Sequence, residues 1–246
     1  MDVYGLIGHP LGHSFSKQFF TDKFENEGID AKYINFDISS IEGVLDVIAS
    51  NPDLKGFNVT IPYKQKIIPY LDDISKEARL IGAVNVVKVV RNGVNLRLKG
   101  YNSDIIGFKE SISPLLYPHH KKALVLGTGG ASKAVKCALE QIGLETILVS
   151  RYSRPGTVSY GDIDEDAIHE YEVIVNCTPV GMYPNDLECP NLPYESMNSN
   201  NLLFDLVYNP ENTLFMKKGK KVGAVVKNGL EMLILQALAS WDIWTH

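Results

Sequence analysis

The stretch KALVLGTGGASKA, at residues 122–134, joins an apolar segment to a glycine-rich turn and then to residues that favour a helix. The apolar segment at 122–127 is typical of a buried strand, and the helical pattern continues well beyond the glycines. A strand that passes through a tight turn into a helix is the first half of a β–α–β unit, which builds a parallel sheet. This stretch therefore predicts an α/β fold.

The glycines of the same turn also have a chemical use. Gly127 permits a tight turn, and Gly129 lets the backbone approach a pyrophosphate at the helix N-terminus, where unpaired N–H groups and the helix dipole favour an anion. Ser132 stands where the usual fingerprint has its last glycine, and it is small enough for close packing of the helix on the strand. We therefore predict a dinucleotide site here, with an ordinary βα turn as the alternative.

The residues roughly 20 positions further on indicate which dinucleotide such a site prefers. An NAD enzyme places an acidic residue after its second strand, whereas this chain has SRYSR at 150–154, with two arginines and no acid. Arg151 and Arg154 are suited to pair with a 2′-phosphate, which favours NADP. Two solvated surface arginines are the alternative.

Strand and helix patterns continue on both sides of the glycine turn. On the N-terminal side, strands are expected at 3–8, 31–37 and 56–60, helices at 14–27 and 41–50, and a hairpin at Asn92-Gly93. On the C-terminal side, strands are expected at 146–150, 172–177, 201–208 and 221–226, and an apolar helix at 229–244. We predict two units with a boundary near residues 100–104, and periodicity alone leaves the last helix open to either.

The composition excludes several classes of protein. Of the 246 residues, 45% are hydrophobic and 22% charged, which is typical of a globular protein. The net charge of -5 offers no basic stripe to nucleic acid, and no apolar run approaches the ~20 residues that cross a bilayer. The start lacks a secretory pattern, and the three cysteines show neither a disulfide framework nor a zinc spacing. We expect a cytoplasmic protein that binds no nucleic acid, membrane or metal.

A second stretch, GFNVTIPYK at 56–64, places polar side chains along one face of a strand. Side chains alternate between the two faces of an extended chain, which assigns four apolar side chains to the core: Phe57, Val59, Ile61 and Tyr63. The opposite face carries an amide, a hydroxyl and an ammonium, from Asn58, Thr60 and Lys64. None has an obvious structural use, so we interpret them as groups that hydrogen-bond a ligand. A surface lysine with a solvated tail is the alternative for Lys64.

Other polar positions have ordinary structural interpretations when each is taken alone. They are helix capping for Ser14, Ser16 and Asp104, local backbone bonding for Asn85, and a helix edge for Gln236.

Taken together and in order, these pieces resemble the shikimate dehydrogenase family. The matching stretches span almost the whole chain: IGHPLGHSFS, FNVTIPYK, GAVN, NSDIIGF, LGTGGASKA, NCTPVGMYP, FDLVYNP and GLEMLILQA. The resemblance implies reversible, NADP-linked reduction of 3-dehydroshikimate to shikimate, a step of aromatic amino-acid biosynthesis. It also implies a substrate domain at 1–103, to which 229–246 returns, and a Rossmann-type NADP domain at 104–228.

The resemblance also assigns roles to individual residues. Lys64 and Asp104 correspond to the catalytic pair of the family. With Asp104, the residues expected to hold the substrate are Ser14, Ser16, Thr60, Asn85, Tyr208 and Gln236. Those expected to hold the cofactor are Gly127, Thr128, Gly129, Gly130, Ala131, Ser150, Arg151, Arg154, Leu206 and Gly229.

Three departures from the family pattern accompany the resemblance. Asn-Ser-Asp-Ile stands at 102–105 where Asn-Thr-Asp-Gly is common, and the connection at 152–170 is short for a crossover helix. The chain stops at His246, soon after the helix that carries Gln236, where many relatives continue. We expect the last difference to affect packing at the edge and not the chemistry.

Two rival functions remain open. The protein is expected to be a monomer or a homodimer. The first rival is a quinate/shikimate dehydrogenase with dual substrate or dual NAD/NADP use, against which the serines of HSFS and the two arginines argue. The second is a non-catalytic NADPH-binding module, whose signature would be loss of Lys64 or Asp104, and both are present.

Overall fold

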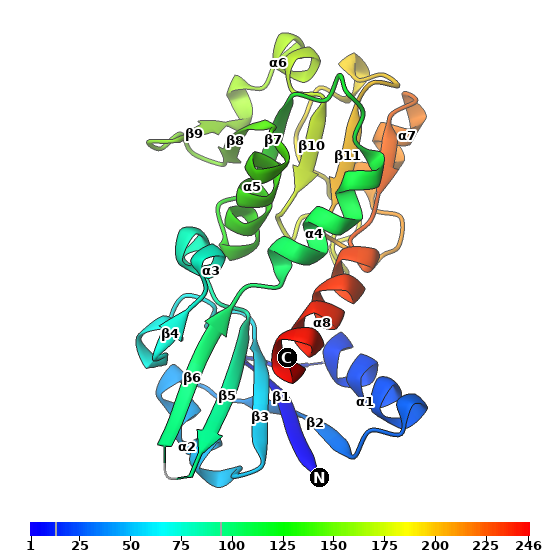
Figure 1. The fold of residues 1–246 in the computed structure, drawn as a ribbon. Coiled ribbons are helices and arrows are strands. Elements are labelled where there is room, and N and C mark those ends of the chain that lie inside the picture. Colours follow the sequence, from blue (N-terminus) through cyan, green and yellow to red (C-terminus); the bar gives the residue numbers. More distant parts are fainter. Residues whose placement is uncertain (13, 94) are drawn as a thin grey trace. The chain divides into compact units, whose positions relative to one another are not determined.

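The computed structural model describes residues 1–12, 14–93 and 95–246, drawn as a ribbon in Figure 1. The chain forms two compact units, one of residues 1–103 with 237–246 and the other of residues 104–236. Within the described residues each unit contains one six-stranded sheet with helices beside it. The predicted α/β fold is therefore confirmed, while the roles of the two units stay a prediction.

The sheet of the first unit has the strand order β2-β1-β3-β5-β6-β4. The strands are β1 (Asp2–Gly8), β2 (Ala31–Asp37), β3 (Leu54–Val59), β4 (Asp73–Ile74), β5 (Val86–Asn92) and β6 (Asn95–Tyr101). β1 is parallel to β2 and β3, whereas β5 is antiparallel to β3 and β6. The β5–β6 pair is the predicted hairpin, and Gly93 adopts the positive φ of 61° that its turn requires.

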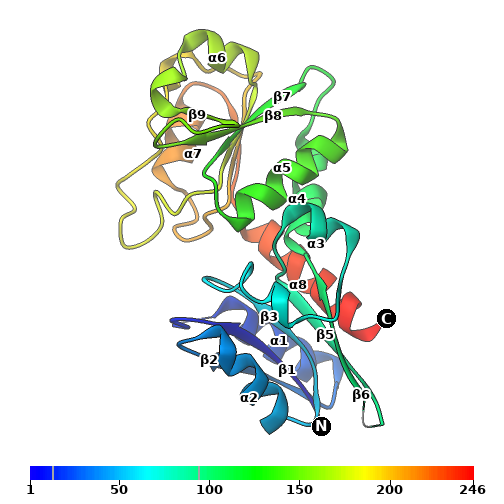
Figure 2. The same cartoon turned by 90° about the vertical axis from the view of Figure 1, so that its left-hand side faces the viewer.

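Helices cover both faces of this sheet, as Figure 2 shows. They are α1 (Phe15–Glu27), η1 (Ile41–Gly43), α2 (Val44–Ser50), η2 (Ile68–Tyr70), α3 (Lys76–Ile81) and the second half of α8 (Leu230–Thr245). Tyr4 and Leu6 of β1 pack in one cluster with α1 and α8, while Val3 and Ile7 pack in another with α2. The alternation of side chains along β1 therefore divides the core into two layers.

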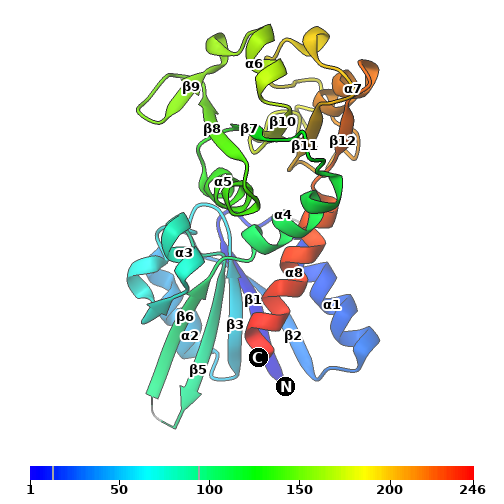
Figure 3. The ribbon, with the colours of Figure 1, turned by 45° about the horizontal axis from the view of Figure 1, so that its top comes forward.

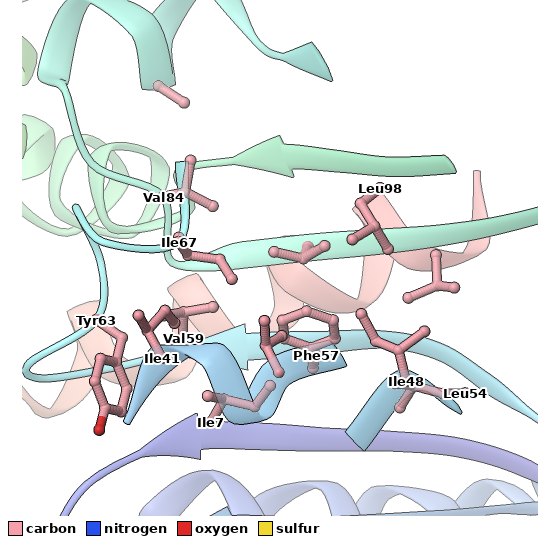
Figure 4. Close-up of a cluster of buried hydrophobic side chains, with 14 of the residues drawn as sticks. Ile7, Ile41, Ile48, Leu54, Phe57, Val59, Tyr63, Ile67, Val84 and Leu98 are labelled. Atoms are coloured by element: carbon pink, nitrogen blue, oxygen red, sulfur yellow. The ribbon is translucent and has the colours of Figure 1, made fainter. Parts of the chain in front are cut away.

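The α2 side of the sheet contains the larger of these two clusters (Figure 4). Phe57, Val59 and Tyr63 lie in it, as predicted, but Ile61 is 76% exposed. The strand ends at Val59, and the N–H of Tyr63 then bonds to the carbonyl of Thr60 at 2.8 Å, which closes a turn. Because alternation applies only to extended backbone, the core position predicted for Ile61 was wrong.

The α8 side of the sheet depends on a glycine. A Cβ on Gly56 of β3 would lie 2.2 Å from Cδ1 of Trp244, so no larger residue fits there without movement. Trp244 also donates its Nε1–H to the carbonyl of Val87 at 3.1 Å. The end of α8 is thus fixed to β3 and β5.

The second unit has a parallel sheet with the order β12-β11-β10-β7-β8-β9. Its strands are β7 (Lys122–Leu126), β8 (Glu145–Ser150), β9 (Thr157–Ser159), β10 (Val173–Asn176), β11 (Leu202–Asp205) and β12 (Val225–Lys227). Its helices are α4 (Asp104–Ile112), η3 (Ser113–Leu115), α5 (Gly130–Ile142), η4 (Tyr160–Asp162), α6 (Glu165–Glu170), η5 (Tyr194–Ser196), α7 (Leu214–Lys221) and the first half of α8. Figure 3 shows α4 and α5 on one side of this sheet, and α6 and α7 on the other. The predicted parallel sheet with crossover helices is confirmed.

Two predicted strands are shorter or displaced. The strand expected at 201–208 ends at Asp205, whose side chain bonds to the N–H of Val207 and turns the chain. The strand expected at 221–226 begins only at Val225, because α7 extends to Lys221 and Gly223 follows with a φ of 89°.

The short connection at 152–170 holds β9, η4 and the six residues of α6. Among the described residues, no helix has the length and apolarity needed to span a membrane.

Candidate active site

The first group of predicted site residues lies where β1 and β3 end and β5 begins. The N–H of Thr60 bonds to the carbonyl of Ile7 at 2.9 Å, and the N–H of Val84 bonds to the carbonyl of Lys64 at 2.7 Å. Asn85 directly precedes β5, and its carbonyl accepts the N–H of Val59 at 2.9 Å. Because β5 is antiparallel to β3, its start meets the end of β3, which brings Thr60, Lys64 and Asn85 to one edge of the sheet.

Both predicted serines lie at the start of α1. Ser14 is the N-cap, and its Oγ accepts the N–H of Lys17 at 3.3 Å. Capping uses only a lone pair of this hydroxyl, so its proton stays available to a ligand. Ser16 lies in the first turn, next to Tyr33. Burial raises the pKa of Tyr33, and a side-chain hydrogen bond with Ser16 opposes that rise.

The segment that leads to these serines is held by Asp37 at the end of β2. His9 Nδ1 lies 2.6 Å from one carboxylate oxygen of Asp37, and the N–H of Leu11 bonds to the other at 2.9 Å. The hydrogen bond from His9, followed by that from Leu11, holds the pKa of Asp37 below its usual range. Asp37 thus holds the side chain of His9 and the backbone of Leu11, shortly before Ser14.

Asn58 has a structural use that the sequence did not indicate. Its Oδ1 accepts the hydroxyl of Tyr33 at 2.8 Å, and its Nδ2 donates to Ser240 Oγ at 3.0 Å and to the carbonyl of Asn85 at 3.3 Å. Ser103 completes the network, since its N–H bonds to Asn85 Oδ1 at 2.7 Å and its Oγ lies 3.0 Å from Ser240 Oγ. All five residues are buried. The ligand-binding interpretation of Asn58 is corrected accordingly: its amide supports Asn85 from inside the unit.

Asp104 and Gln236 belong to the second unit, and both are buried. A Cβ on Gly107 of α4 would lie 2.6 Å from the carbonyl of Met232 and 2.8 Å from the backbone N of Gln236, so α4 and α8 cross in backbone contact there. Asp104 begins α4 one turn before Gly107, on the same helix face. The fold therefore places Asp104 and Gln236 at the same helix crossing. Ile105, the departure from the family pattern, is buried in this unit.

The glycine turn after β7 has the shape that a pyrophosphate needs. Gly127 has a φ of 111°, and a Cβ there would lie 3.1 Å from Ser132 Oγ and 3.2 Å from Thr178 Cγ2. Ser132 is fully buried, so the helix packs closely on the strand despite the missing glycine. Gly129 precedes α5 with nothing within 4 Å of its Cβ position. Since the first N–H groups of a helix have no partner inside it, this open turn fits the phosphates of a dinucleotide.

The SRYSR segment follows β8, which lies beside β7 in the sheet. Ser150 Oγ bonds to the carbonyl of Tyr152, and the N–H of Arg154 bonds to Thr157 Oγ1 at 3.0 Å. The backbone of this segment is therefore held, while Arg151 and Arg154 are exposed. Neither guanidinium forms an ion pair with a described carboxylate, so both are available to an anionic ligand.

Leu206 and Gly229 lie together beyond the end of β11. A Cβ on Gly229 would lie only 2.2 Å from the carbonyl oxygen of Leu206, and the N–H of Gly229 bonds to the carbonyl of Val207 at 3.3 Å. Only glycine permits this approach of two backbones. Tyr208, two residues after Leu206, has a side chain that is 40% exposed.

Asp205 is a buried carboxylate to which sequence reasoning gave no role. It is fully buried at the end of β11 and accepts hydrogen bonds from Thr213 Oγ1 at 2.6 Å, Asn176 Nδ2 at 2.9 Å and the N–H of Val207 at 3.1 Å. Burial raises the pKa of Asp205 to about 6, and these hydrogen bonds oppose the rise. The signal in the sequence is an acid directly after three apolar strand residues, in LLFD. Among the described residues, no group of three or more His, Cys, Asp or Glu is placed to hold a metal ion.

Comparison with known proteins identifies relatives over the whole chain. Residues 6–87 match the family described as the shikimate dehydrogenase substrate binding domain. Shikimate dehydrogenase (NADP(+)) from Methanococcus maripaludis is 38% identical over 262 aligned positions, which cover 99% of this chain and 91% of the relative.

Solved structures show the same relationship. Shikimate dehydrogenase from Aquifex aeolicus has a TM-score of 0.87 and 34% identity, and the match covers 99% of this chain and 92% of that one. Shikimate 5-dehydrogenase from Thermus thermophilus, in complex with NADP(H) and shikimate, also has a TM-score of 0.87, with 32% identity over 100% of this chain and 94% of that one. This chain belongs to the shikimate dehydrogenase family.

Proposed function

We propose that the chain catalyses the reversible, NADP-linked reduction of 3-dehydroshikimate to shikimate, a step of aromatic amino-acid biosynthesis. The observation that most supports this is the near full-length similarity to relatives named for the reaction. The chain also carries Lys64 and Asp104, which correspond to the catalytic pair of the family. A non-catalytic relative would not need to keep them.

Neutral polar groups in the first unit are suited to hold the substrate. A polyhydroxylated ring needs many short hydrogen bonds, and Ser14, Ser16, Thr60 and Asn85 supply hydroxyl and amide groups without adding charge. Thr60 and Asn85 lie at one sheet edge, where hydrogen bonds to Ile7 and Val59 fix their backbones. The substrate carboxylate is assigned to the two serines, with Tyr208 and Gln236 supplied by the second unit.

Lys64 is the proposed acid and base, and Asp104 its partner. When bound, NADPH would supply a hydride to the carbonyl carbon of the substrate, which would leave negative charge on the oxygen. The ammonium of Lys64 stabilises this charge and delivers a proton to the oxygen, and in the reverse direction its amine removes the proton from the hydroxyl. The carboxylate of Asp104 accepts a hydrogen bond from the substrate and balances the charge of the ammonium.

The second unit is proposed to hold the cofactor. The turn from Gly127 to Ala131 receives the pyrophosphate at the start of α5, and Arg151 and Arg154 bind the 2′-phosphate, with Ser150 at the base of their segment. Leu206 and Gly229 are assigned to the nicotinamide. Their close backbone approach gives that end of the cofactor a fixed surface.

The function is tested by following the absorbance of reduced nicotinamide with shikimate or quinate and with NADP or NAD. We expect the fastest turnover with shikimate and NADP. Equal rates with quinate or with NAD would instead indicate the dual-specificity enzyme. Binding of NADPH without turnover of either acid would indicate a non-catalytic module and contradict the proposal.

The carboxylate role of the serines predicts a specific kinetic change. Replacing both Ser14 and Ser16 by alanine removes two donors to the charged carboxylate of the substrate, and since each such bond contributes roughly 1.5–3 kcal/mol, KM for shikimate should rise about 100-fold. The change in kcat should be smaller, because binding and not proton transfer is affected.

Loss of the Ser14 cap also costs about 1 kcal/mol of stability, so thermal unfolding should be measured beside the kinetics. Ser14→Asn is the matched control, since asparagine keeps the cap. If kcat falls more than KM rises in the double variant, the serines do not have the proposed role.

Two expectations, about localisation and oligomeric state, complete the proposal. We propose that the enzyme works in the cytoplasm as a monomer or homodimer, and three cysteines that form no disulfide are compatible with a reducing compartment. Light scattering coupled to size exclusion measures the oligomeric state directly.

A further inference from the structure

Asp205 has a buried carboxylate without a counter-charge. Among the described residues, no lysine, arginine or histidine forms an ion pair with it. A buried charge without a cation destabilises a fold unless hydrogen bonds replace its water, and here three donors do so. An apolar residue would leave these three buried donors without an acceptor, so the position needs an oxygen acceptor.

The three donors come from three different segments of the second unit. Asn176 ends β10, directly opposite Asp205 in the parallel register. Val207 belongs to the segment beyond β11. Thr213 is the N-cap of α7, and its Oγ1 also accepts the N–H of Met216 at 3.3 Å. One carboxylate thus holds together two strand ends and the start of a helix.

The connection continues to the glycine turn. Asn176 Oδ1 accepts the hydroxyl of Thr178 at 2.6 Å, and Thr178 Cγ2 is one of the atoms packed against Gly127. On the other side of the network, the N–H of Leu206 bonds to the carbonyl of Asn176 at 2.9 Å. A continuous set of contacts therefore joins Gly127 to the segment 206–208 through Asp205.

An ionised carboxylate satisfies all three bonds. A carboxylate only accepts hydrogen bonds; Asn176 Nδ2 and the N–H of Val207 can only donate, and the hydroxyl of Thr213 donates here although it can also accept. Asparagine at this position would keep one acceptor oxygen but turn an N–H group toward one of the donors.

We propose that Asp205 is a positioning residue whose carboxylate fixes the segment 206–208, and with it Leu206 and Tyr208, for cofactor and substrate. The inference rests on the proposed function, because the roles of Leu206 and Tyr208 come from it.

The titration of Asp205 offers a signature. Its pKa is raised by burial to about 6. The titratable groups that interact electrostatically with Asp205 are Cys177 and Tyr194. Burial is the main cause that raises the pKa of each, so both stay neutral. As the pH falls through about 6, the carboxyl gains a proton and one acceptor becomes a donor. The segment 206–208 then loosens, and kcat/KM should fall.

The same proton has the opposite effect on stability. Because the folded-state pKa lies above the reference value of 3.8, the folded protein binds this proton more tightly than the unfolded chain does. The contribution of Asp205 to stability is complete below pH 3.8 and lost as the pH rises through about 6. Acidification should therefore make the protein more stable through this group and less active. A purely structural role would change both in the same direction.

Two sets of variants test the proposal. Thr213→Val removes the hydrogen bond to the charged carboxylate and also the N-cap bond to Met216, and it should lower kcat/KM about 10-fold, whereas Thr213→Ser keeps both bonds and should stay within about 2-fold. Asp205→Asn should remove both the fall of kcat/KM and the gain of stability on acidification. The free energy of unfolding and kcat/KM are measured for each at about pH 7.5 and about pH 5.5.

Amide hydrogen exchange of the ligand-free protein gives a readout that needs no activity. Exchange at Val207 should be faster in Thr213→Val and Asp205→Asn than in wild type and in Thr213→Ser. If wild type fails to oxidise shikimate, the proposed function fails. The exchange result still shows whether Asp205 fixes the segment 206–208. If Asp205→Asn does not fold, the two Thr213 variants decide. Equal exchange and equal kcat/KM in these two variants would overturn the inference.

Discussion

Replacing Lys64 by alanine is expected to lower kcat for shikimate oxidation by about 10²–10⁴-fold, the usual contribution of a positioned acid or base. KM should stay within a few-fold, since we propose that hydroxyl and amide groups of Ser14, Thr60 and Asn85 hold the substrate. The fold should persist, because the contact that Lys64 makes with Val84 uses the backbone carbonyl. Steady-state kinetics with saturating NADP, together with thermal unfolding, measure both effects.

Two further lysine variants separate the possible causes of such a loss. Lys66→Ala removes an exposed ammonium from the same segment and should leave kcat unchanged. Lys64→Arg keeps the positive charge but replaces the ammonium by a group that does not release its proton, so it should remain slow. Turnover of Lys64→Ala near the wild-type rate would remove Lys64 from the reaction.

Local signals in the sequence predicted the parts of the fold that depend on neighbours along the chain. The N-cap at Ser14 and the β5–β6 hairpin at Asn92-Gly93 are examples, because capping and turn formation involve only a few consecutive residues. The glycine turn at Gly127 is another, since a positive φ there has a direct sequence signature.

Features that depend on distant contacts could not be predicted from pattern alone. Asn58 bonds to Ser240, 182 residues away, and nothing in either local sequence indicates the pairing. Ile61 follows the alternation but lies past the end of the strand, where the turn at Thr60 redirects the chain. Asp205 reads as the continuation of a strand, although its side chain ends that strand by bonding to Val207. A long-range polar bond decided the role of Asn58, whereas local turns after the strand ends decided the positions of Ile61 and Asp205.

The partnership of Lys64 and Asp104 stays a prediction for a related reason. The two residues belong to different units, each with its own core. The resemblance of the two motifs to those of the family indicates the pair, but only a measurement of catalysis tests it. Asp104→Asn in the background of Lys64→Ala should then add less than it does alone, because residues that act together are not additive.

Replacing both Arg151 and Arg154 by alanine is expected to raise KM for NADP about 100-fold and to leave KM for NAD unchanged. A hydrogen bond to a charged group contributes roughly 1.5–3 kcal/mol, so loss of two such contacts removes about 3 kcal/mol or more, and each 1.4 kcal/mol is about 10-fold in affinity. NAD has no 2′-phosphate, so it provides an internal comparison. The backbone bonds of Arg154 to Thr157 remain in the variant, which keeps the segment in place.

The salt dependence of KM separates a phosphate contact from a change in shape. Wild-type KM for NADP should rise with ionic strength, because exposed charges are screened over about 10 Å at 0.1 M salt, and the double variant should lose most of this dependence. Arg97→Ala removes an exposed arginine of β6 and is the matched control. Equal increases for NADP and NAD would place the arginines on the part that both cofactors share. No change for either would mean that the two guanidinium groups are ordinary surface charges, and the preference for NADP would need another origin than this pair.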